Sequence, residues 1–435
     1  MFNKLFAFFQ NKLEFLYQNS RILQNLDSLI LFSILAVIVS SVFAPSESIG
    51  IFAIIATVLT FVKLLIKKGE KLECNKFELF LLAYFMFAII SLCGSSLFML
   101  SLKGFTKIVI YLGFYLSVVQ YLKNNKDKIW WIIFTIAGCV AYEVLHGLVQ
   151  TVVRPEAIST WQDTSYLNPE EVINRVYGTL KPLNPNLFGG YLVATIPTLF
   201  AVTGYFTYKN KLTSSIISGI FAILSMYVLF QTGCRGAYLG LFAILVVTIL
   251  VSAKFFWNEY KNIFINTVGG LVVIGSALVL SVTSLRARIL SIFIMREDSS
   301  NSFRFNVYNS CIDMFKDNWL LGIGLGNKNF REIYGLYMKT GFDALSAYNI
   351  YLETAVESGI FALISFVAFL FLAIKDAFKY IKNSTNILSV IVVTSAVASI
   401  IGLMIHGFVD TVFFRPQIHF IFWTMVAIIN IQTRD

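Results

Sequence analysis

Residues 28–45 read SLILFSILAVIVSSVFAP and residues 47–66 read ESIGIFAIIATVLTFVKLLI, and these two stretches decide the class of fold. Each is close to the ~20 mostly apolar residues that an α-helix needs to cross the hydrocarbon core of a membrane. A turn of a few residues joins them, so the chain crosses the membrane and returns. The sequence therefore predicts a transmembrane helical hairpin near the start of the chain.

Apolar runs of this kind recur along almost the whole chain. Of its 435 residues, 57% are apolar and 13% are charged, and the mean hydropathy is +0.75, whereas soluble chains average about 45–50% apolar and about 25% charged. We predict an all-α polytopic membrane protein of about twelve transmembrane helices with a large external loop domain. The predicted spans are 28–45, 47–66, 77–99, 103–122, 129–152, 187–206, 212–231, 235–253, 265–283, 347–374, 387–411 and 415–432. One long broken helix is the alternative for the pair 212–231 and 235–253.

The basic residues of the short connections define the orientation. The turn at 44–48 has no basic residue and the turn at 100–103 has one, Lys103, whereas the alternate loops are rich in lysine. Cytoplasmic loops carry the excess of lysine and arginine in membrane proteins, so both termini are predicted to be cytoplasmic. This asymmetry accounts for most of the formal net charge of +10 without a nucleic-acid partner. The lysines on the predicted inner side are Lys67, Lys68, Lys71, Lys76, Lys123, Lys126, Lys128, Lys209, Lys211, Lys254, Lys261, Lys375, Lys379 and Lys382.

The connections divide the chain into four regions. Residues 1–27 are amphipathic and are predicted to lie along the cytoplasmic surface of the membrane. Residues 28–283 hold transmembrane helices 1–9, with an external loop at 153–186. Residues 284–346 form a large external loop, which is too long for a turn and is expected to fold as a small domain. Residues 347–435 hold helices 10–12 and a short cytoplasmic tail.

The sequence shows no motif for a cofactor or a metal. The five cysteines and three histidines are scattered, with neither the spacing of metal ligands nor a disulfide framework. The chain contains no phosphate-binding P-loop and no glycine-rich dinucleotide motif after a strand. We therefore expect no cofactor, no bound metal and no ATP site.

Two arginines stand out by their positions. Arg235 lies at the junction of two predicted spans, where a charge costs ~2.5–3.5 kcal/mol on insertion scales. Arg235 either forms a structural ion pair or contacts lipid headgroups, or it is part of an anion-binding site. Arg304 precedes a helix-like stretch at 305–315 in the cation-rich external loop, where it is either a solvated charge or part of a site. Topology does not explain the positive charge of this long loop, so the charge points to function.

Two carboxylates and an amide share one predicted helical face. Asn349, Glu353 and Glu357 follow one another at intervals of four residues, which places them in line along a helix. Inside an apolar span such groups face a polar cavity or a cationic partner, and Arg235 or Arg304 is the predicted partner. A polar clamp between helices is the alternative.

Two further stretches carry polar or flexible residues. Asp410, four residues after His406, and Arg415 place an anion and a cation at one external hairpin, either as a simple ion pair or as part of a site. The glycine-rich stretch 322–327 permits tight turns or close approach of the backbone to a ligand, and both explanations stay open.

The order of these motifs resembles the O-antigen ligase family of bacterial membrane glycosyltransferases, which also includes polysaccharide polymerases. The twelve-span layout with a large external loop between the later spans fits the same family. The matching region covers roughly residues 180–365. The matching motifs are LNPNLFG at 183–189, TGCRGA at 232–237, Arg304 with DNWLLGIGLGN at 317–327, and NIYLETAVESG at 349–359.

The resemblance implies a transfer of a lipid-linked glycan at the outer face of the bacterial inner membrane, as in lipopolysaccharide biosynthesis. A glycan on undecaprenyl diphosphate is the donor and a hydroxyl of a lipid or glycan is the acceptor, without nucleotide sugar or metal. Guanidinium groups bind phosphate bidentately and stabilise a diphosphate leaving group in a low-dielectric pocket. This role falls to Arg235 and Arg304. The other predicted substrate-binding residues are Asn186, Asn349, Asp410 and Arg415.

One residue departs from the family pattern. Ligases usually have a histidine, the proposed base, where this chain has Tyr348. Free tyrosine has a pKa of ~10, so Tyr348 acts as the base only if nearby arginines lower its pKa. Glu353 or Glu357 is the alternative base. One alternative function is that of a polymerase of the same superfamily. Another is that of a non-enzymatic transporter of an anion such as bicarbonate, because residues 346–348 and 410–417 resemble a branch often labelled as inorganic-carbon transporters.

Overall fold

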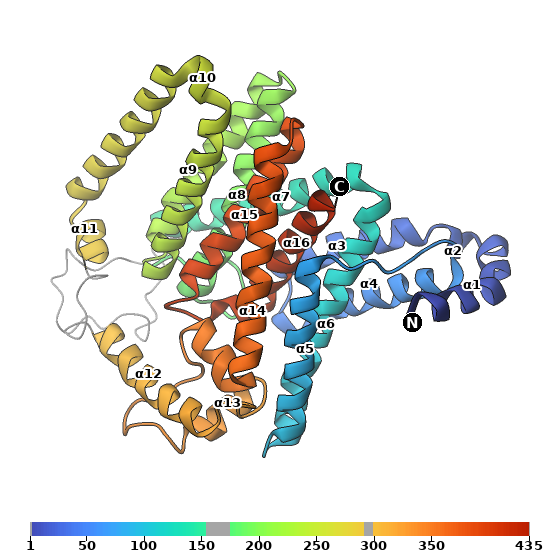
Figure 1. Ribbon diagram of the computed structural model, residues 1–435. Helices are drawn as coiled ribbons and strands as arrows, with labels where there is room; N and C mark the ends of the chain where they lie inside the picture. The colour runs from blue at the N-terminus through green and yellow to red at the C-terminus, as the bar shows by residue number, and fades with distance from the viewer. Residues whose placement is uncertain (1, 154–174, 291–298, 435) are drawn as a thin grey trace.

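The structure is a computed structural model that describes residues 2–153, 175–290 and 299–434, and the regular elements in these ranges are helices. The long ones are α3 (Leu26–Phe43), α4 (Ser46–Ile66), α5 (Lys76–Gly94), α6 (Phe98–Asn124), α7 (Ile129–Val153), α8 (Pro185–Tyr208), α9 (Leu212–Gln231), α10 (Arg235–Ser281), α14 (Ile350–Asn383), α15 (Ile387–His406) and α16 (Pro416–Thr433). Figure 1 shows α14 and α15 in the middle of the bundle, with α5 and α6 on one flank and α9 and α10 on the other.

Ten helices of the described ranges are long and apolar enough to cross a membrane. One of them, α10, bends at Tyr260 (φ −124°, ψ 27°), and its two arms match the predicted spans 235–253 and 265–283. α16 matches the last predicted span in addition to these ten. The all-α polytopic fold is therefore confirmed, and a helical segment lies at every predicted span.

The predicted helix ends were wrong beside the site. α14 begins at Ile350 instead of 347, and α15 ends at His406 instead of 411. Hydropathy extended both spans too far because it does not detect the capping turns at their ends. α9 and α10 are two separate helices rather than one broken helix. The chain reverses between them at Gly233, whose φ of +63° favours glycine.

Close helix packing fixes the middle of the bundle. A Cβ atom on Gly240 of α10 would lie 2.9 Å from the carbonyl oxygen of Gly402 in α15, so glycine allows these two backbones to approach. Small residues have the same effect in membrane helix pairs generally. α16 is buried along residues 417–432 and packs on α6, α14 and α15. The helix starts that carry the site are therefore held by a dense core.

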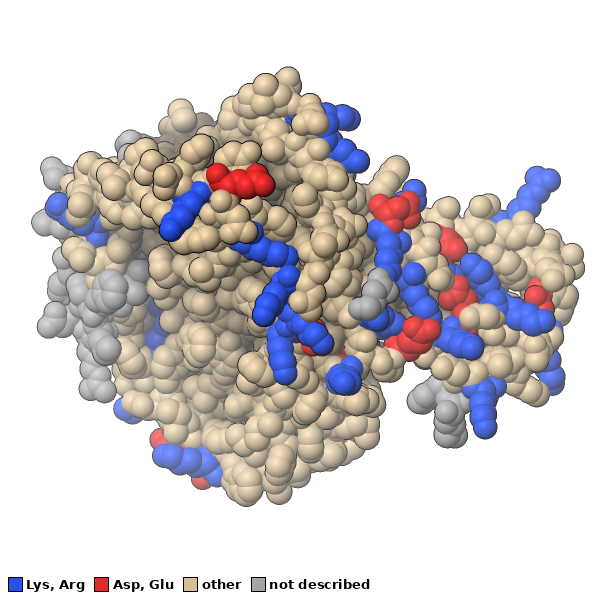
Figure 2. Space-filling view, turned by 45° about the horizontal axis from the view of Figure 1, so that its top comes forward, with Lys and Arg blue, Asp and Glu red and all other residues tan. Residues whose placement is uncertain are grey.

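Basic side chains gather at one end of the bundle, which we call the terminal end because α1 (Phe2–Asn19) and the C-terminus lie there. Figure 2 turns the top of Figure 1 toward the viewer and shows lysine and arginine side chains over this face. Lys254 donates from Nζ to the carbonyl oxygens of Ile381 (2.5 Å) and Lys382 (3.0 Å), which ties the bend of α10 to the end of α14. Lys254 at the terminal end therefore also satisfies carbonyl groups at the C-terminal end of α14.

Residues 299–349 fold over the opposite end of the bundle, which we call the site end. This segment contains α12 (Ser299–Asp317) and α13 (Asn327–Tyr334), and α12 includes the stretch 305–315 that was predicted to be helical. The shorter α11 (Thr283–Leu290) precedes it. Residues 154–174 of the predicted external loop and residues 291–298 lie outside the described residues. The segment shares one buried cluster: Val307, Cys311, Met314, Ile323, Phe330, Tyr334, Ala344, Ala347 and Val356.

Candidate active site

The site end brings together the first turns of several helices. α8, α10, α14 and α16 begin there, and α15 ends there. The first turn of a helix carries N–H groups without intrahelical partners and a partial positive charge, both of which favour anions. The site end is therefore an electrostatically suitable place for an anionic group.

Arg175 lies among these helix starts and was not predicted from the sequence. Its Nε donates to the carbonyl oxygen of Thr232 (2.7 Å) and its Nη2 donates to Oδ1 of Asn186 (2.5 Å). Burial lowers the pKa of Arg175, while the nearby charge of Asp410 opposes that effect. Arginine nevertheless remains a cation at neutral pH. The feature of the sequence that could have identified Arg175 is the position of an arginine in a predicted external loop, shortly before the motif at 183–189.

Helix α7 holds the backbone that carries Arg175. The buried carboxylate of Glu143 accepts hydrogen bonds from the N–H (3.0 Å) and the hydroxyl of Thr179. Gln150 accepts the N–H groups of Tyr177 and Gly178 (3.0 Å each) and donates to the carbonyl oxygen of Gly178 (3.0 Å). These bonds position the chain after Arg175 and thereby the arginine itself.

Asp410 connects the two sides of the site. Its Oδ1 accepts the backbone N–H groups of the next two residues (2.7 and 3.1 Å), and its Oδ2 accepts Nδ2 of Asn186 (3.0 Å). Nη2 of Arg304 lies 3.9 Å from the same Oδ2. Since Asn186 also accepts from Arg175, the four side chains form one network. Three of these residues, Asn186, Arg304 and Asp410, were predicted.

Tyr348 faces this network in an unusual backbone conformation. Its φ is +50°, a region that costs a non-glycine residue about 1–3 kcal/mol and is often found at functional sites. Cζ of Arg304 lies 5.8 Å from the centre of the Tyr348 ring. Burial, with Asp410, raises the pKa of Tyr348 above its usual value of 10, and Arg304 only partly opposes this. Tyr348 is therefore neutral at pH 7, which removes the condition under which it would act as a base.

Arg235 is the first residue of α10 and is half-buried. It follows the turn that Arg175 covers, so both arginines belong to the site end. Sγ of the preceding Cys234 lies 3.6 Å from Nε2 of His406, and both of these side chains are buried. This pair joins the start of α10 to the end of α15 directly behind the network.

Asn349 caps helix α14. Its Oδ1 accepts the N–H groups of Tyr351 and Leu352 (both 2.9 Å), and its Nδ2 donates to the carbonyl oxygen of Phe408 (3.1 Å). Such caps satisfy the N–H groups of the first turn. The structure thus gives this side chain a role in the fold, and its contact with substrate stays a prediction.

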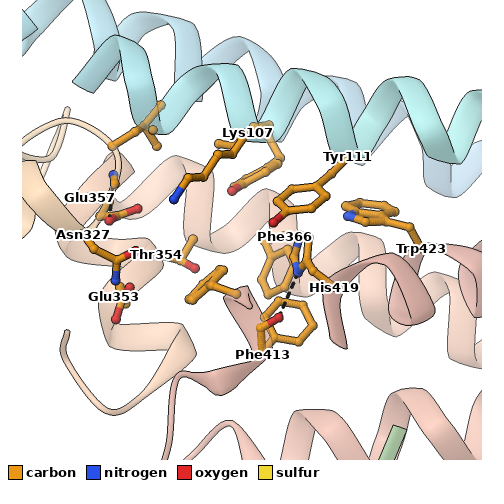
Figure 3. Close-up of a pocket in the computed structure, with 16 residues that line it drawn as sticks. Lys107, Tyr111, Asn327, Glu353, Thr354, Glu357, Phe366, Phe413, His419 and Trp423 are labelled. Carbon is orange, nitrogen blue, oxygen red and sulfur yellow. Dashed lines mark hydrogen bonds between the residues drawn. The ribbon is translucent and has the colours of Figure 1, made fainter. Parts of the chain in front are cut away.

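Glu353 and Glu357 line one pocket, as their helical spacing predicted (Figure 3). Oε2 of Glu353 accepts the N–H of Ala347 (3.0 Å), and Oε1 of Glu357 accepts the N–H of Gly326 (2.9 Å). The cation that lines this pocket in the described structure is Lys107 of α6. The predicted partners, Arg235 and Arg304, do not line it. The interval of four residues reveals a shared helical face, but it cannot show which neighbouring helix covers that face.

The glycine-rich stretch 322–327 packs against a break in α14. At Gly359 (φ +80°, ψ 176°) the helix is interrupted, and the carbonyl oxygens of Val356 and Glu357 accept the N–H groups of Ile323 (2.9 Å) and Gly324 (3.0 Å). A break in a spanning helix is tolerated where other groups satisfy its backbone. The three glycines of the stretch have positive φ. Of the two explanations left open by the sequence, the structure favours turns and packing.

Arg415 is exposed just before α16. Within the described residues it makes no ion pair with Asp410, which pairs with Arg304 instead. The hairpin ion pair, one of the two predicted alternatives, is therefore wrong, because Asp410 turns inward to bind the following backbone N–H groups. In the same described ranges no three His, Cys, Asp or Glu side chains gather to hold a metal ion.

Comparisons with known proteins give two similarities. The sequence model of the family described as O-Antigen ligase matches residues 220–367, about a third of the chain, and this range contains Arg235, Arg304 and Tyr348. The teichuronic acid biosynthesis protein TuaE of Bacillus subtilis (strain 168) is 21% identical over 388 residues, which are 85% of this chain and 75% of that protein. Together with the ordered motifs and the polytopic helical fold, these matches support the resemblance of the chain to the O-antigen ligase and polysaccharide polymerase superfamily, membrane proteins of glycan assembly.

Proposed function

We propose that this protein transfers a glycan from undecaprenyl diphosphate to a hydroxyl of a lipid or glycan, at the outer face of the bacterial inner membrane. The observation that carries the proposal is the network in which Asn186 and Asp410 hold Arg175 and Arg304 beside converging helix starts. Guanidinium groups and helix N-termini are the two groups that proteins commonly use to bind phosphate. The similarity to the superfamily supports the glycan donor.

The arginines act on the leaving group. The acceptor oxygen attacks the anomeric carbon of the donor sugar, and the bond from that carbon to the phosphate oxygen breaks. The diphosphate leaves with the electron pair, so negative charge grows on its oxygens. Fixed positive groups at this position stabilise the transition state more than the ground state. Arg175, Arg235 and Arg304 supply these groups.

Glu353 is the base in this proposal. Its carboxylate is 2% exposed, binds the backbone directly before Tyr348, and lines the pocket of Figure 3. A carboxylate within reach of the acceptor hydroxyl accepts the proton as the new glycosidic bond forms. Tyr348, being neutral, donates a hydrogen bond to a substrate oxygen, while Glu357 holds the glycine-rich stretch through Gly326.

The surroundings of the site fit a lipid carrier. Below Arg235, α10 presents exposed apolar side chains, among them Phe242 (69% exposed) and Leu250 (66% exposed). In a bilayer this face contacts acyl chains, and an undecaprenyl tail would lie along it. The lysine-rich terminal end supports the proposed orientation, with both termini in the cytoplasm.

A second candidate is polymerisation, in which the acceptor is another glycan on a carrier lipid. The relative named for teichuronic acid biosynthesis favours this candidate. The two reactions share donor and leaving group, so they differ in the acceptor alone. Anion transport, the third alternative, requires a polar path through both halves of the membrane.

The test uses purified protein in liposomes with an undecaprenyl-diphosphate glycan as donor. The acceptor is either a second copy of that lipid-linked glycan or a lipid without a glycan, and donor binding and bicarbonate flux are measured separately. Transfer is expected in wild type and should fall at least ~100-fold in Arg175→Ala and Arg304→Ala. Arg331→Ala is the matched control, because Arg331 is 54% exposed and pairs with Asp343 on the surface.

The products separate the candidates. Longer chains on the carrier lipid identify a polymerase, and transfer to the other lipid identifies a ligase. The proposal would be overturned if folded wild-type protein conducts bicarbonate but neither binds the donor nor transfers the glycan.

A further inference from the structure

The pocket that Glu353 and Glu357 line lies beside the arginine network, with walls from α6, α14, α16 and the stretches 322–327 and 412–414 (Figure 3). Its volume is about 70 Å³, and one bound water needs ~10–15 Å³ by this kind of measure. Lys107 of α6 lines the pocket. This residue lies roughly 13 Å along the helix from Phe98, at a rise of 1.5 Å per residue. Because Lys107 is also exposed, the pocket opens to the surface of the bundle beside α6.

Hydrogen-bond donors and acceptors of neutral side chains point into this pocket. Trp423 is 97% buried, and its indole N–H has no acceptor among the described residues. Figure 3 shows this nitrogen, and the hydroxyl of Tyr111, facing the cavity. Nδ1 of His419 lies 3.1 Å from the carbonyl oxygen of Phe413, which can only accept, so Nδ1 carries the proton. Nε2 of the neutral ring is then an acceptor.

Charged groups and aromatic faces complete the lining. Lys107 adds a donor, and Glu353 and Glu357 add acceptors beyond the single backbone N–H that each one binds. The rings of Tyr111 and His419 lie 4.3 Å apart in an edge-to-face arrangement and form one wall. Phe366 and Phe413 add apolar surface. A ligand that fits must therefore be compact, rich in hydroxyl groups and partly apolar on its faces.

We infer that this pocket binds one neutral sugar ring, the hydroxyl-bearing residue of the acceptor; the inference rests on the proposed function. The two carboxylates disfavour a phosphate, and Lys107 disfavours a metal cation. A pyranose offers alternating hydroxyl donors and acceptors around an apolar C–H face, which matches Trp423, His419 and Tyr111. Aromatic rings pack well against such faces.

The position of Glu353 links the pocket to the reaction. One of its oxygens binds the N–H of Ala347, directly before Tyr348, and its carboxylate lines the pocket. A hydroxyl of a sugar bound in this pocket is therefore adjacent to the carboxylate that we propose as the base. The side opening at Lys107 admits the rest of an acceptor that is anchored in the membrane.

The test measures binding of the sugar alone. Saturation-transfer NMR on the full-length protein in nanodiscs uses the methyl β-glycosides of glucose, galactose and N-acetylglucosamine as probes, each at a concentration of tens of millimolar. Wild type should give saturation transfer to at least one probe. Trp423→Phe and Tyr111→Phe each remove one polar group and should weaken binding about 5-fold, and the double variant should weaken it at least ~10-fold. Trp319→Phe is the control, because Trp319 is 52% exposed.

Parallel measurement of donor binding separates this inference from the proposed function. Loss of donor binding in Arg304→Ala with glycoside binding retained supports both. Glycoside binding without any donor binding in wild type supports the pocket while the proposed function fails. Donor binding without glycoside binding, or equal glycoside affinity in wild type and the folded double variant, overturns the inference.

Discussion

The two ends of this bundle both contain buried charges, and they use them differently. At the terminal end, Nζ of Lys63 lies 2.6 Å from Asp27 and 3.2 Å from Glu70, and the lysine is 3% exposed. At the site end, Arg304 lies 3.9 Å from Asp410, and Arg175 donates to the neutral oxygens of Asn186 and Thr232. The terminal end neutralises its lysine by direct contact with two carboxylates, whereas at the site end Arg175 donates to neutral oxygens and Arg304 lies farther from its carboxylate.

This difference separates a structural cluster from a candidate binding site. A buried ion pair in direct contact resists solvent and fixes two helices, here α3 and α4, but leaves little charge for a ligand. A guanidinium group that donates to amide and carbonyl oxygens, as that of Arg175 does, keeps more of its field for an incoming anion. The side chain of Lys63 is 3% exposed and that of Arg304 is 19% exposed, so both cations are largely buried and their contacts distinguish them more clearly.

The largest expected effect is kinetic and falls on the site end. Arg304→Lys keeps the charge but loses the planar fork that binds phosphate bidentately. We expect transfer to fall about 100-fold in the liposome assay, with a thermal unfolding temperature close to that of wild type. Near-normal transfer by this variant would show that Arg304 supplies only general positive charge.

The next effect is on stability and falls on the terminal end. Lys63→Met removes the cation and leaves Asp27 and Glu70 without it, which should lower the free energy of unfolding by about 2 kcal/mol, less than for a fully buried pair because Asp27 is 35% exposed. Denaturant unfolding in mild detergent measures this, and Lys68→Met, whose side chain is 65% exposed, is the control. Transfer per folded molecule should not change; a loss as large as that of Arg304→Lys would contradict the division of roles.

Asn186→Ala sharpens the comparison because it removes a neutral link rather than a charge. Both Arg175 and Asp410 lose one hydrogen bond, so the arginine loses its fixed position. We expect about 10-fold slower transfer, mainly through weaker donor binding, measured by titrating the donor in liposomes. Asn383→Ala at the exposed end of α14 is the control. Unchanged kinetics in Asn186→Ala would remove Asn186 from the network's function.

The smallest effect concerns Tyr348 and pH. The raised pKa of Tyr348 keeps its phenol protonated. The contribution of Tyr348 to stability is therefore present below pH 10 and is lost only as the pH rises through this raised pKa. Transfer by wild type should show no inflection from this residue between pH 7 and 9, and Tyr348→Phe should cost a few-fold. Tyr348→His introduces a group with a pKa of ~6.5 and should add an inflection near neutrality. An inflection from pH 7 to 9 that disappears in Tyr348→Phe would instead make the tyrosine the base.

Sequence patterns located much of this site but not its connections. The four-residue interval placed Glu353 and Glu357 on one face, and both do line one pocket. The same interval included Asn349, which proved to be a helix cap. Arg175 was missed because a single arginine in a long loop has no periodicity to mark it. Its contacts come from residues far along the chain.

The sequence by itself determined the polytopic all-α fold, the approximate spans and the shared faces of short helical stretches. These properties depend on the hydropathy of about twenty consecutive residues and on the period of the helix, both of which are local. The tertiary structure alone decided that Arg175 meets Asn186, that Lys107 faces the glutamates, and that Trp423 points into their pocket. Each of these contacts joins different segments of the chain, and their geometry is set by how the helices pack rather than by any one segment.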